Sequence, residues 1–146
     1  MSAEEVRQVS DRFYSGMNRA LNGDPSAMSE LPEVCSQTDD ISVMSEMGGR
    51  QLGWPEVSAF FAMGAQAVSS GSVEMSDLRV TLLGPDGACT SGTVTASVLL
   101  GTTPLNFSAR CTDVFRREGG AWKLVHHHLD RLPDAGAFQA AMTQDN

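Results

Sequence analysis

Residues 110–130 read RCTDVFRREGGAWKLVHHHLD, and this stretch decides the fold that we expect for the chain. Two runs of strand-forming residues flank Gly119-Gly120, a pair that tolerates the positive φ angles of a two-residue hairpin turn. Successive side chains of a strand point to opposite faces, so His126 and His128 share one face and His127 takes the other. Imidazoles titrate near neutral pH and are suited to proton transfer and metal binding. We expect His126 and His128 to point inward, and His127 to be a surface or interface residue.

The loop length of this hairpin decides which side chains meet across it, because a shift of one residue exchanges the two faces. A two-residue loop places Asp113 opposite His126 and Cys111 opposite His128, which would bring a carboxylate within reach of an imidazole. A three-residue loop that also includes Glu118 gives two other pairs, Thr112 with His126 and Arg110 with His128. Both registers are open, and in the second one Arg110 and Thr112 become polar anchors for a bound molecule.

The rest of the chain shows helical periodicity first and strand alternation afterwards. Apolar residues three and four positions apart predict a long first helix, and prolines mark the start or end of two further helices. The predicted helices cover 2–22, about 25–31, and 55–68, the last ending at Ser69-Ser70-Gly71. Alternating β-branched residues predict strands within 35–46 and at about 73–83, 88–100 and 104–117. This order predicts an α+β domain, an antiparallel sheet with helices on one face.

Composition limits the classes of partner and compartment. The 146 residues suit one domain, and the net charge of −8 disfavours nucleic acid and anionic membranes as partners. No run of about eighteen apolar residues occurs, so no membrane span is expected. Three widely spaced cysteines without a CxxC motif favour a reduced cytoplasmic location.

The order of elements, together with WKLVHHH at 122–128 after the Gly-Gly turn, resembles the SnoaL-like and ketosteroid-isomerase-like superfamily, also called nuclear transport factor two-like. The resemblance implies a cone-shaped, strongly bent antiparallel sheet whose pocket is closed by N-terminal helices. It also implies a homodimer formed through the outer sheet surface. The domain would cover 1–133, with 134–146 as a short C-terminal tail. Isomerases, cyclases, hydrolases, dehydratases and non-catalytic proteins share this scaffold, so function depends on the site.

Ketosteroid isomerase itself uses an aspartate base and an oxyanion hole made of a tyrosine and a protonated aspartate. Its pattern Asp-x-Phe-Arg-x-x-Gly is matched by DVFRREG at 113–119, so the resemblance implies that Asp113 belongs to the site. The position of the base, counted from Asp40, falls on Ser45, with Glu46 beside it. A hydroxyl cannot abstract a proton from carbon unaided, so the resemblance does not extend to steroid isomerisation itself.

The last strand also resembles the association domain of calcium/calmodulin-dependent kinase. That domain carries a tryptophan, a valine and spaced histidines that are similar to Trp122, Val125, His126 and His128. It assembles subunits and performs no chemistry. The resemblance therefore leaves open a non-catalytic role as a ligand-binding or dimerisation module, which the missing carboxylate at Ser45 also favours.

Our hypothesis from the sequence is a pocket that binds a small apolar carbonyl compound and isomerises, cyclises or dehydrates it without a cofactor. His126 would be the general base or acid, Asp113 would orient it or donate to a developing oxyanion, and His128 would assist. The apolar wall would contain Tyr14, Met17, Met44, Trp54 and Phe61. No metal site is expected, because no nearby HxxxH or cysteine cluster adds ligands to the two histidines.

Overall fold

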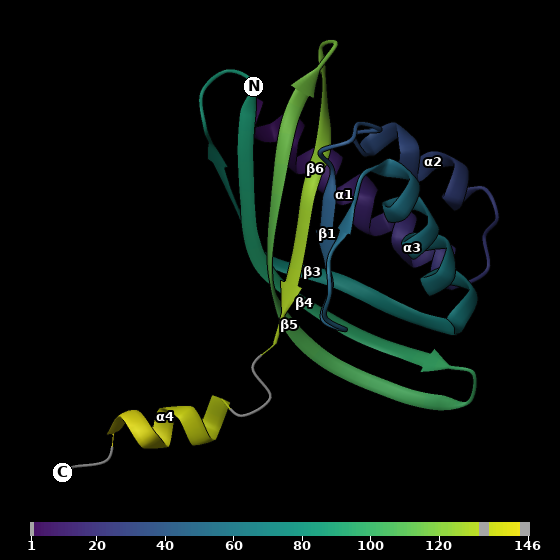
Figure 1. Cartoon of the computed structure of the whole chain (residues 1–146), viewed down its shortest axis with the longest axis vertical. Helices are drawn as coiled ribbons and strands as arrows, with labels where there is room; N and C mark the ends of the chain where they lie inside the picture. Colours follow the sequence, from purple (N-terminus) through teal and green to yellow (C-terminus); the bar gives the residue numbers. More distant parts are fainter. Residues whose placement is uncertain (1, 132–134, 144–146) are drawn as a thin grey trace.

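Six strands form one strongly curled, open sheet, and three N-terminal helices lie against its concave side (Figure 1). The computed structural model describes residues 2–131 and 135–143. Its helices are α1 (Ser2–Leu21), α2 (Ala27–Val34), α3 (Trp54–Ala67) and α4 (Ala135–Thr143). Its strands are β1 (Ser42–Met44), β2 (Gln51–Leu52), β3 (Val68–Leu82), β4 (Gly87–Leu100), β5 (Thr103–Glu118) and β6 (Ala121–Asp130). The predicted α+β class is confirmed.

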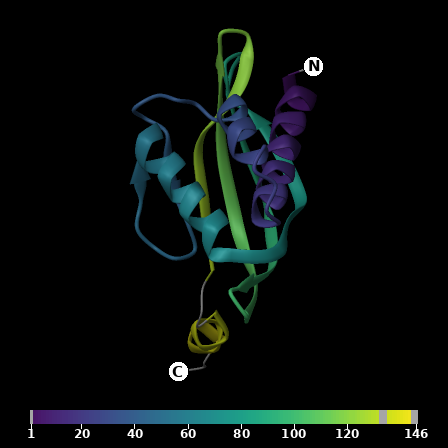
Figure 2. The same cartoon turned by 90° about the vertical axis from the view of Figure 1, so that its right-hand side faces the viewer.

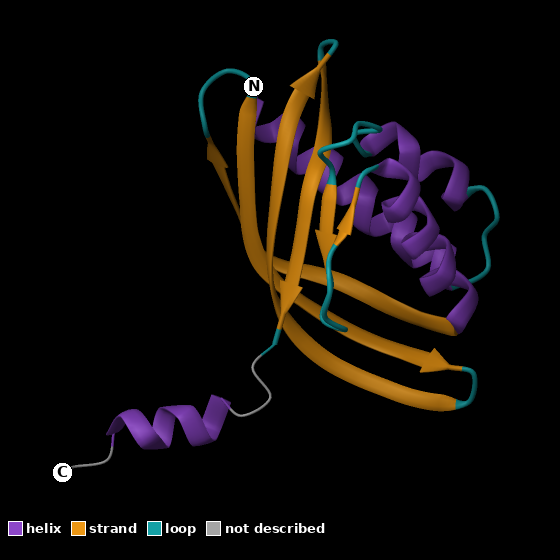
Figure 3. Ribbon diagram, in the orientation of Figure 1, coloured by secondary structure: helices purple, strands orange, loops and turns teal. Residues whose placement is uncertain are grey.

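The strand order is β2-β1-β6-β5-β4-β3, and all neighbours are antiparallel except β1 and β6. The short β1 runs parallel to β6, which makes the sheet mixed where a wholly antiparallel sheet was expected. The four long strands β3 to β6 follow one another through hairpins and bend together toward the helices (Figure 3). Their curvature creates the concave surface on which the helices pack.

Helix α1 crosses the concave side because one stripe of its surface is apolar. Val6, Phe13 and Tyr14 of this helix are buried in the core, and Phe115 and Leu124 of the sheet are buried with them. Figure 2 shows α1, α2 and α3 side by side in front of the strands. Burial of this apolar stripe is the main force that holds the helices on the sheet.

Three predicted boundaries were wrong. The second helix continues past Pro32 to Val34, because burial of Leu31 and Val34 offsets the one backbone donor that proline lacks. The predicted loop at 69–71 belongs to β3, where Ser70 and Gly71 pair with β4 and the Gly71 backbone also bonds to the Asn22 side chain. Of the predicted strand 35–46, Ser42–Met44 forms β1 and Cys35 makes an isolated bridge to Leu124 of β6. The short strand β2 was not predicted.

The pairing of β3 with β4 contains an irregularity. The register shifts between Ser76 and Arg79, and Asp77 has a positive φ of 55°. Gly92 lies opposite on β4, where a Cβ atom would come within 2.5 Å of the Met75 sulfur and 2.8 Å of the Ser76 carbonyl oxygen. Only glycine fits this close approach, so Gly92 lets the two strands curl together.

No helix of the described residues is long and apolar enough to cross a membrane. The predicted division into a domain of 1–133 and a tail of 134–146 stays a prediction. The boundary between residues 133 and 134 falls within 132–134, which lie outside the described residues.

Candidate functional site

Of the two loops that the sequence left open, the last hairpin has the two-residue loop, but not the pairing expected with it. Glu118 pairs with Ala121, and both loop residues, Gly119 and Gly120, have positive φ angles. Farther along, Phe115 pairs with Leu124 and Val114 with His126, which leaves Val125 without a partner. Val125 is therefore a β-bulge, one extra residue in β6.

The bulge moves every later residue of β6 by one position relative to β5. Asp113 pairs with His127, Thr112 with His128 and Arg110 with Asp130. Both predicted registers were therefore wrong, since each assumed a regular ladder beyond the loop. The expectation that His127 is a surface or interface residue was also wrong, because its exposed fraction within the single chain is 3%.

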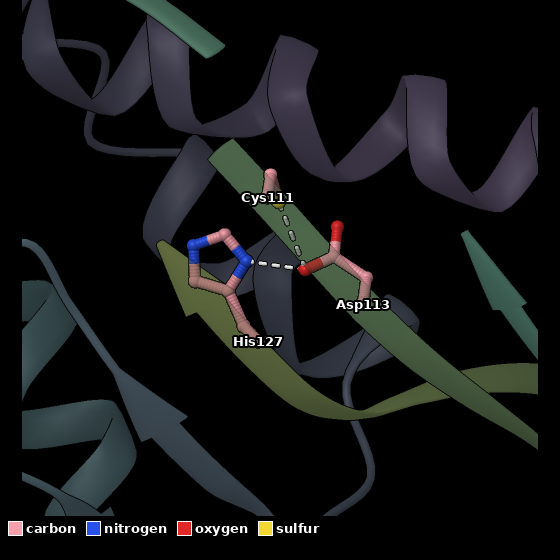
Figure 4. Close-up of side chains that lie close together, drawn as sticks. All are labelled: Cys111, Asp113 and His127. Atoms are coloured by element: carbon pink, nitrogen blue, oxygen red, sulfur yellow. Dashed lines mark hydrogen bonds and ion pairs between the residues drawn. The ribbon is translucent and has the colours of Figure 1, made fainter. Parts of the chain in front are cut away.

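Asp113 is the centre of a buried cluster formed with Tyr14, Cys111 and His127. Figure 4 shows Asp113 together with Cys111 and His127. Its side chain is 0% exposed. Oδ1 lies 2.6 Å from Nδ1 of His127 and 3.4 Å from Sγ of Cys111. Oδ2 accepts a hydrogen bond of 2.8 Å from the hydroxyl of Tyr14. Three donors thus surround one carboxyl group, which offsets the cost of burying it.

These contacts fix the tautomer of His127. Oδ1 of Asp113 also accepts from the Cys111 thiol, so we assign the imidazole proton to Nδ1, which donates to the same oxygen. Nε2 then carries the free lone pair and can accept a proton. The ring also packs against Phe13, with centroids 5.2 Å apart, and this contact restricts its orientation. The arrangement is that of a general base held by a carboxylate.

The surroundings of the cluster disfavour further negative charge. Burial, followed by the nearby carboxylate of Asp113, raises the pKa of the Tyr14 hydroxyl far above its ordinary value. The same two causes raise the pKa of the Cys111 thiol. Both groups therefore stay protonated at neutral pH and act as hydrogen-bond donors.

The donor types of Cys111, Asp113 and His127 would suit a transition metal, and their ligand atoms lie within 4.8 Å of one another. The spacing, however, is that of a hydrogen bond. Tetrahedral zinc with bonds near 2.0–2.2 Å separates its nitrogen and oxygen ligands by about 3.3 Å. The 2.6 Å between His127 and Asp113 leaves room for a proton and not for an ion. A metal would have to push these two side chains apart.

A cavity of about 390 Å³ lies between the helices and the concave side of the sheet, and His127 is part of its wall. Most of the wall is apolar, with contributions from α1, α2, α3 and strands β3 to β6. The polar or charged residues of the wall are Ser45, Glu46, His127 and Arg131. His127 is thus the buried imidazole of a largely apolar cavity.

The structure brings together only part of the predicted site. Met17 and Phe61 line the cavity, whereas Tyr14 lies behind His127 in the Asp113 cluster. Met44 and Trp54 are half-buried and do not belong to the cavity wall. Whether any of these residues contacts a ligand stays a prediction.

His126 and His128 project from the opposite face of β6, because they alternate with the inward His127. Nδ1 of His126 lies 2.7 Å from the hydroxyl of Ser42, and partial burial lowers its pKa. Arg110 is exposed and pairs with Asp130 at 3.0 Å. Thr112, opposite His128, is exposed as well. The expected convergence of Asp113 and His126 was therefore wrong.

Sequence reasoning gave no site role to two members of the cluster, His127 and Cys111. The role of His127 depends on the bulge at Val125, for which the sequence carries no clear sign. Cys111 could have been found, because it shares the face of Asp113 two residues away on a strand that was predicted.

Comparison with known proteins agrees with this architecture. The family model of the SnoaL-like domain matches residues 6–133. The chain belongs to the SnoaL-like family. Among curated proteins, no sequence match was found.

Solved structures of low sequence identity share the fold. An uncharacterised protein with a cystatin-like fold from Caulobacter vibrioides is similar with a TM-score of 0.76, 14% identity, and 97% of each chain covered. A candidate dehydratase of the nuclear transport factor 2-like family from Streptomyces avermitilis has a TM-score of 0.71 and 23% identity, with 90% of this SnoaL-like chain and 96% of that chain covered. A candidate calcium/calmodulin-dependent kinase II association domain from Xanthomonas campestris has a TM-score of 0.72, 17% identity, and coverages of 90% and 88%.

Proposed function

We propose that this SnoaL-like protein binds a small apolar carbonyl compound and catalyses a proton transfer on it without a cofactor. The observation that carries the proposal is the position of His127, whose Nδ1 is bound to Asp113 while its ring lines an apolar cavity. In the first step, Nε2 takes a proton from the carbon next to the carbonyl group. The electron pair of the broken C–H bond moves to the carbonyl oxygen and gives an enolate.

His127 here takes the role that the sequence had suggested for His126. Asp113 holds the Nδ1 proton and stabilises the imidazolium that forms when Nε2 is protonated. Return of the proton to another carbon would give isomerisation. Dehydration would follow if the enolate electrons form a C=C bond while the C–O bond to a β-hydroxyl breaks, the hydroxyl leaving as water with the proton from the imidazolium. The candidate dehydratase of similar fold is consistent with the second outcome.

The decisive experiment compares two histidines of the same strand. Wild-type protein and the His127→Gln and His126→Gln variants are incubated with a panel of apolar ketones in deuterium oxide, and exchange of the acidic C–H protons is followed by NMR. We expect His127→Gln to lower the exchange rate by about 10² or more, the usual contribution of a general base. With His126→Gln the ketone protons should exchange at the wild-type rate, because His126 faces away from the cavity. A loss of exchange with His126→Gln and wild-type exchange with His127→Gln would contradict the assignment.

The non-catalytic alternative has support from the apolar character of the cavity wall. It would be favoured if no ketone exchanges and native mass spectrometry shows an apolar molecule retained by the purified protein. The same measurement gives the subunit count.

We propose a homodimer formed through the outer sheet face, with His126, His128, Arg110 and Thr112 near that interface. We also propose a cytoplasmic location.

A further inference from the structure

The charged groups of the cavity wall lie at one end, and they differ in sign. Glu46 follows β1, and Arg131 follows the last residue of β6. Since β1 and β6 run parallel with Met44 beside His128, both charged residues come just beyond the same ends of adjacent strands. They do not form an ion pair with each other in the structure. Arg131 is the cationic side chain of the wall.

Arg131, the first residue after β6, continues the face of this strand that carries His127. His127, Leu129 and Arg131 alternate along the chain, and all three line the cavity. Exposure increases along this row, from 3% at His127 through 6% at Leu129 to the exposed Arg131. The cavity therefore extends from a buried imidazole to a guanidinium at its open end.

The guanidinium is held in place by the wall itself. Its central carbon lies 5.3 Å from the ring centroid of Phe107, which also lines the cavity. The nearest acidic neighbour in the chain, Asp130, points to the outer face and pairs with Arg110. Within the described part of the chain Arg131 forms no ion pair, so its hydrogen-bond donors are available to a ligand.

We infer that the ligand is an elongated apolar molecule with an anionic group at one end, which Arg131 binds while the opposite end reaches His127. Four residues of extended chain separate the two side chains, about 13 Å at roughly 3.3 Å per residue. An apolar skeleton bearing a carboxylate would match the wall, the cation and this separation. The inference rests on the proposed function, because it takes His127 as the reacting end.

The test uses two non-reactive fluorescent probes that differ only in charge. 1-Anilinonaphthalene-8-sulfonate is anionic, and N-phenyl-1-naphthylamine is its neutral counterpart without the sulfonate. We expect the wild type to bind the sulfonate more tightly, and Arg131→Gln to weaken sulfonate binding by about tenfold, as for loss of a charge-assisted contact. Binding of the neutral probe should change by less than about twofold, because the apolar wall is intact.

Two further variants separate a specific contact from a general charge effect. Arg79→Gln removes the same charge from an exposed position of β3 outside the cavity and should leave both affinities unchanged. Glu46→Gln removes the carboxylate of the open end and should tighten sulfonate binding. High salt should reduce the preference for the sulfonate.

The outcomes distinguish this inference from the proposed function. Equal binding of both probes by the wild type, or an equal effect of Arg131→Gln on both, would overturn the role of Arg131 and leave proton transfer by His127 intact. His127→Gln should keep the preference for the sulfonate even where it abolishes exchange. If neither probe binds, both the apolar pocket and the anion contact are wrong.

Discussion

At the scale of single residues, the structure separates buried hydroxyls that have a partner from those that do not. Tyr14 donates to the carboxylate of Asp113 at 2.8 Å. Thr90, the cross-strand neighbour of Asp113, is fully buried, and its hydroxyl has no partner among the described residues. A buried hydrogen bond to a charged group stabilises a fold, whereas an unpartnered hydroxyl costs free energy.

We therefore predict opposite outcomes for two conservative substitutions. Tyr14→Phe should lower the free energy of unfolding by about 2 kcal/mol, since one oxygen of Asp113 loses its donor. Thr90→Val keeps the shape and removes the unpartnered hydroxyl, so it should be neutral or stabilising. Urea unfolding followed by circular dichroism measures both values. Similar losses in the two variants would show that the hydrogen bond to Asp113 contributes nothing specific.

At the scale of elements, one unpaired residue decides which histidine faces the cavity. Val125 is extra in β6, so Leu124 and His127 both point inward although they are three positions apart. In a regular strand Leu124 would share its face with His126. The bulge thus buries His127 and turns its two neighbours outward.

Deletion of Val125 is predicted to keep the site. Without the bulge, Leu124 would be followed directly by His126, and every later residue would retain its partner on β5. His127 should then still face Asp113, and NMR should show its Nδ1 proton protected in a hydrogen bond. Insertion of an alanine next to Val125 is the matched control, since it would shift the register and move His127 away from Asp113. Loss of the His127 signal in the deletion variant would contradict the assigned bulge.

At the scale of the whole molecule, Arg116 of β5 ties the segment between α2 and β1 to the sheet. Its guanidinium bonds to Asp40 at 2.7 Å and to Glu118 at 2.8 Å, and also contacts the Ser36 and Thr38 hydroxyls. Hydrogen bonds from Arg116, then from Thr38, hold the pKa of Asp40 well below its ordinary value. This network anchors the chain that leads into β1, the strand beside the histidines.

The lowered pKa of Asp40 predicts a dependence of stability on pH. A carboxyl group with a depressed folded-state pKa stabilises the fold above its unfolded pKa of about 3.9, and this stabilisation is lost as pH falls toward the folded value. Asp40→Asn should thus lower stability at pH 7, by no more than about 1 kcal/mol because the pair is exposed. The difference from wild type should shrink below pH 4. Thermal unfolding at several pH values tests this, with the exposed Asp39→Asn as control; a constant difference would contradict it.

Much of the fold follows from local patterns in the chain. The apolar stripe of 2–22 predicts α1, and the Gly119-Gly120 turn predicts the last hairpin, because each depends on residues a few positions apart. The match of 113–119 to a family pattern also predicts Asp113 as a site residue, and in the structure Asp113 lies at the centre of the buried cluster.

The sequence by itself determined the class of fold, the order of the long strands and the family resemblance, since periodicity and turn chemistry are short-range properties. Only the tertiary structure decided that His127, and not His126, meets Asp113, because the bulge at Val125 arises from how β6 pairs and packs. The tertiary structure also brought Tyr14 from 99 residues away to the same carboxylate. Contacts across such separations depend on packing between elements, which no local pattern encodes.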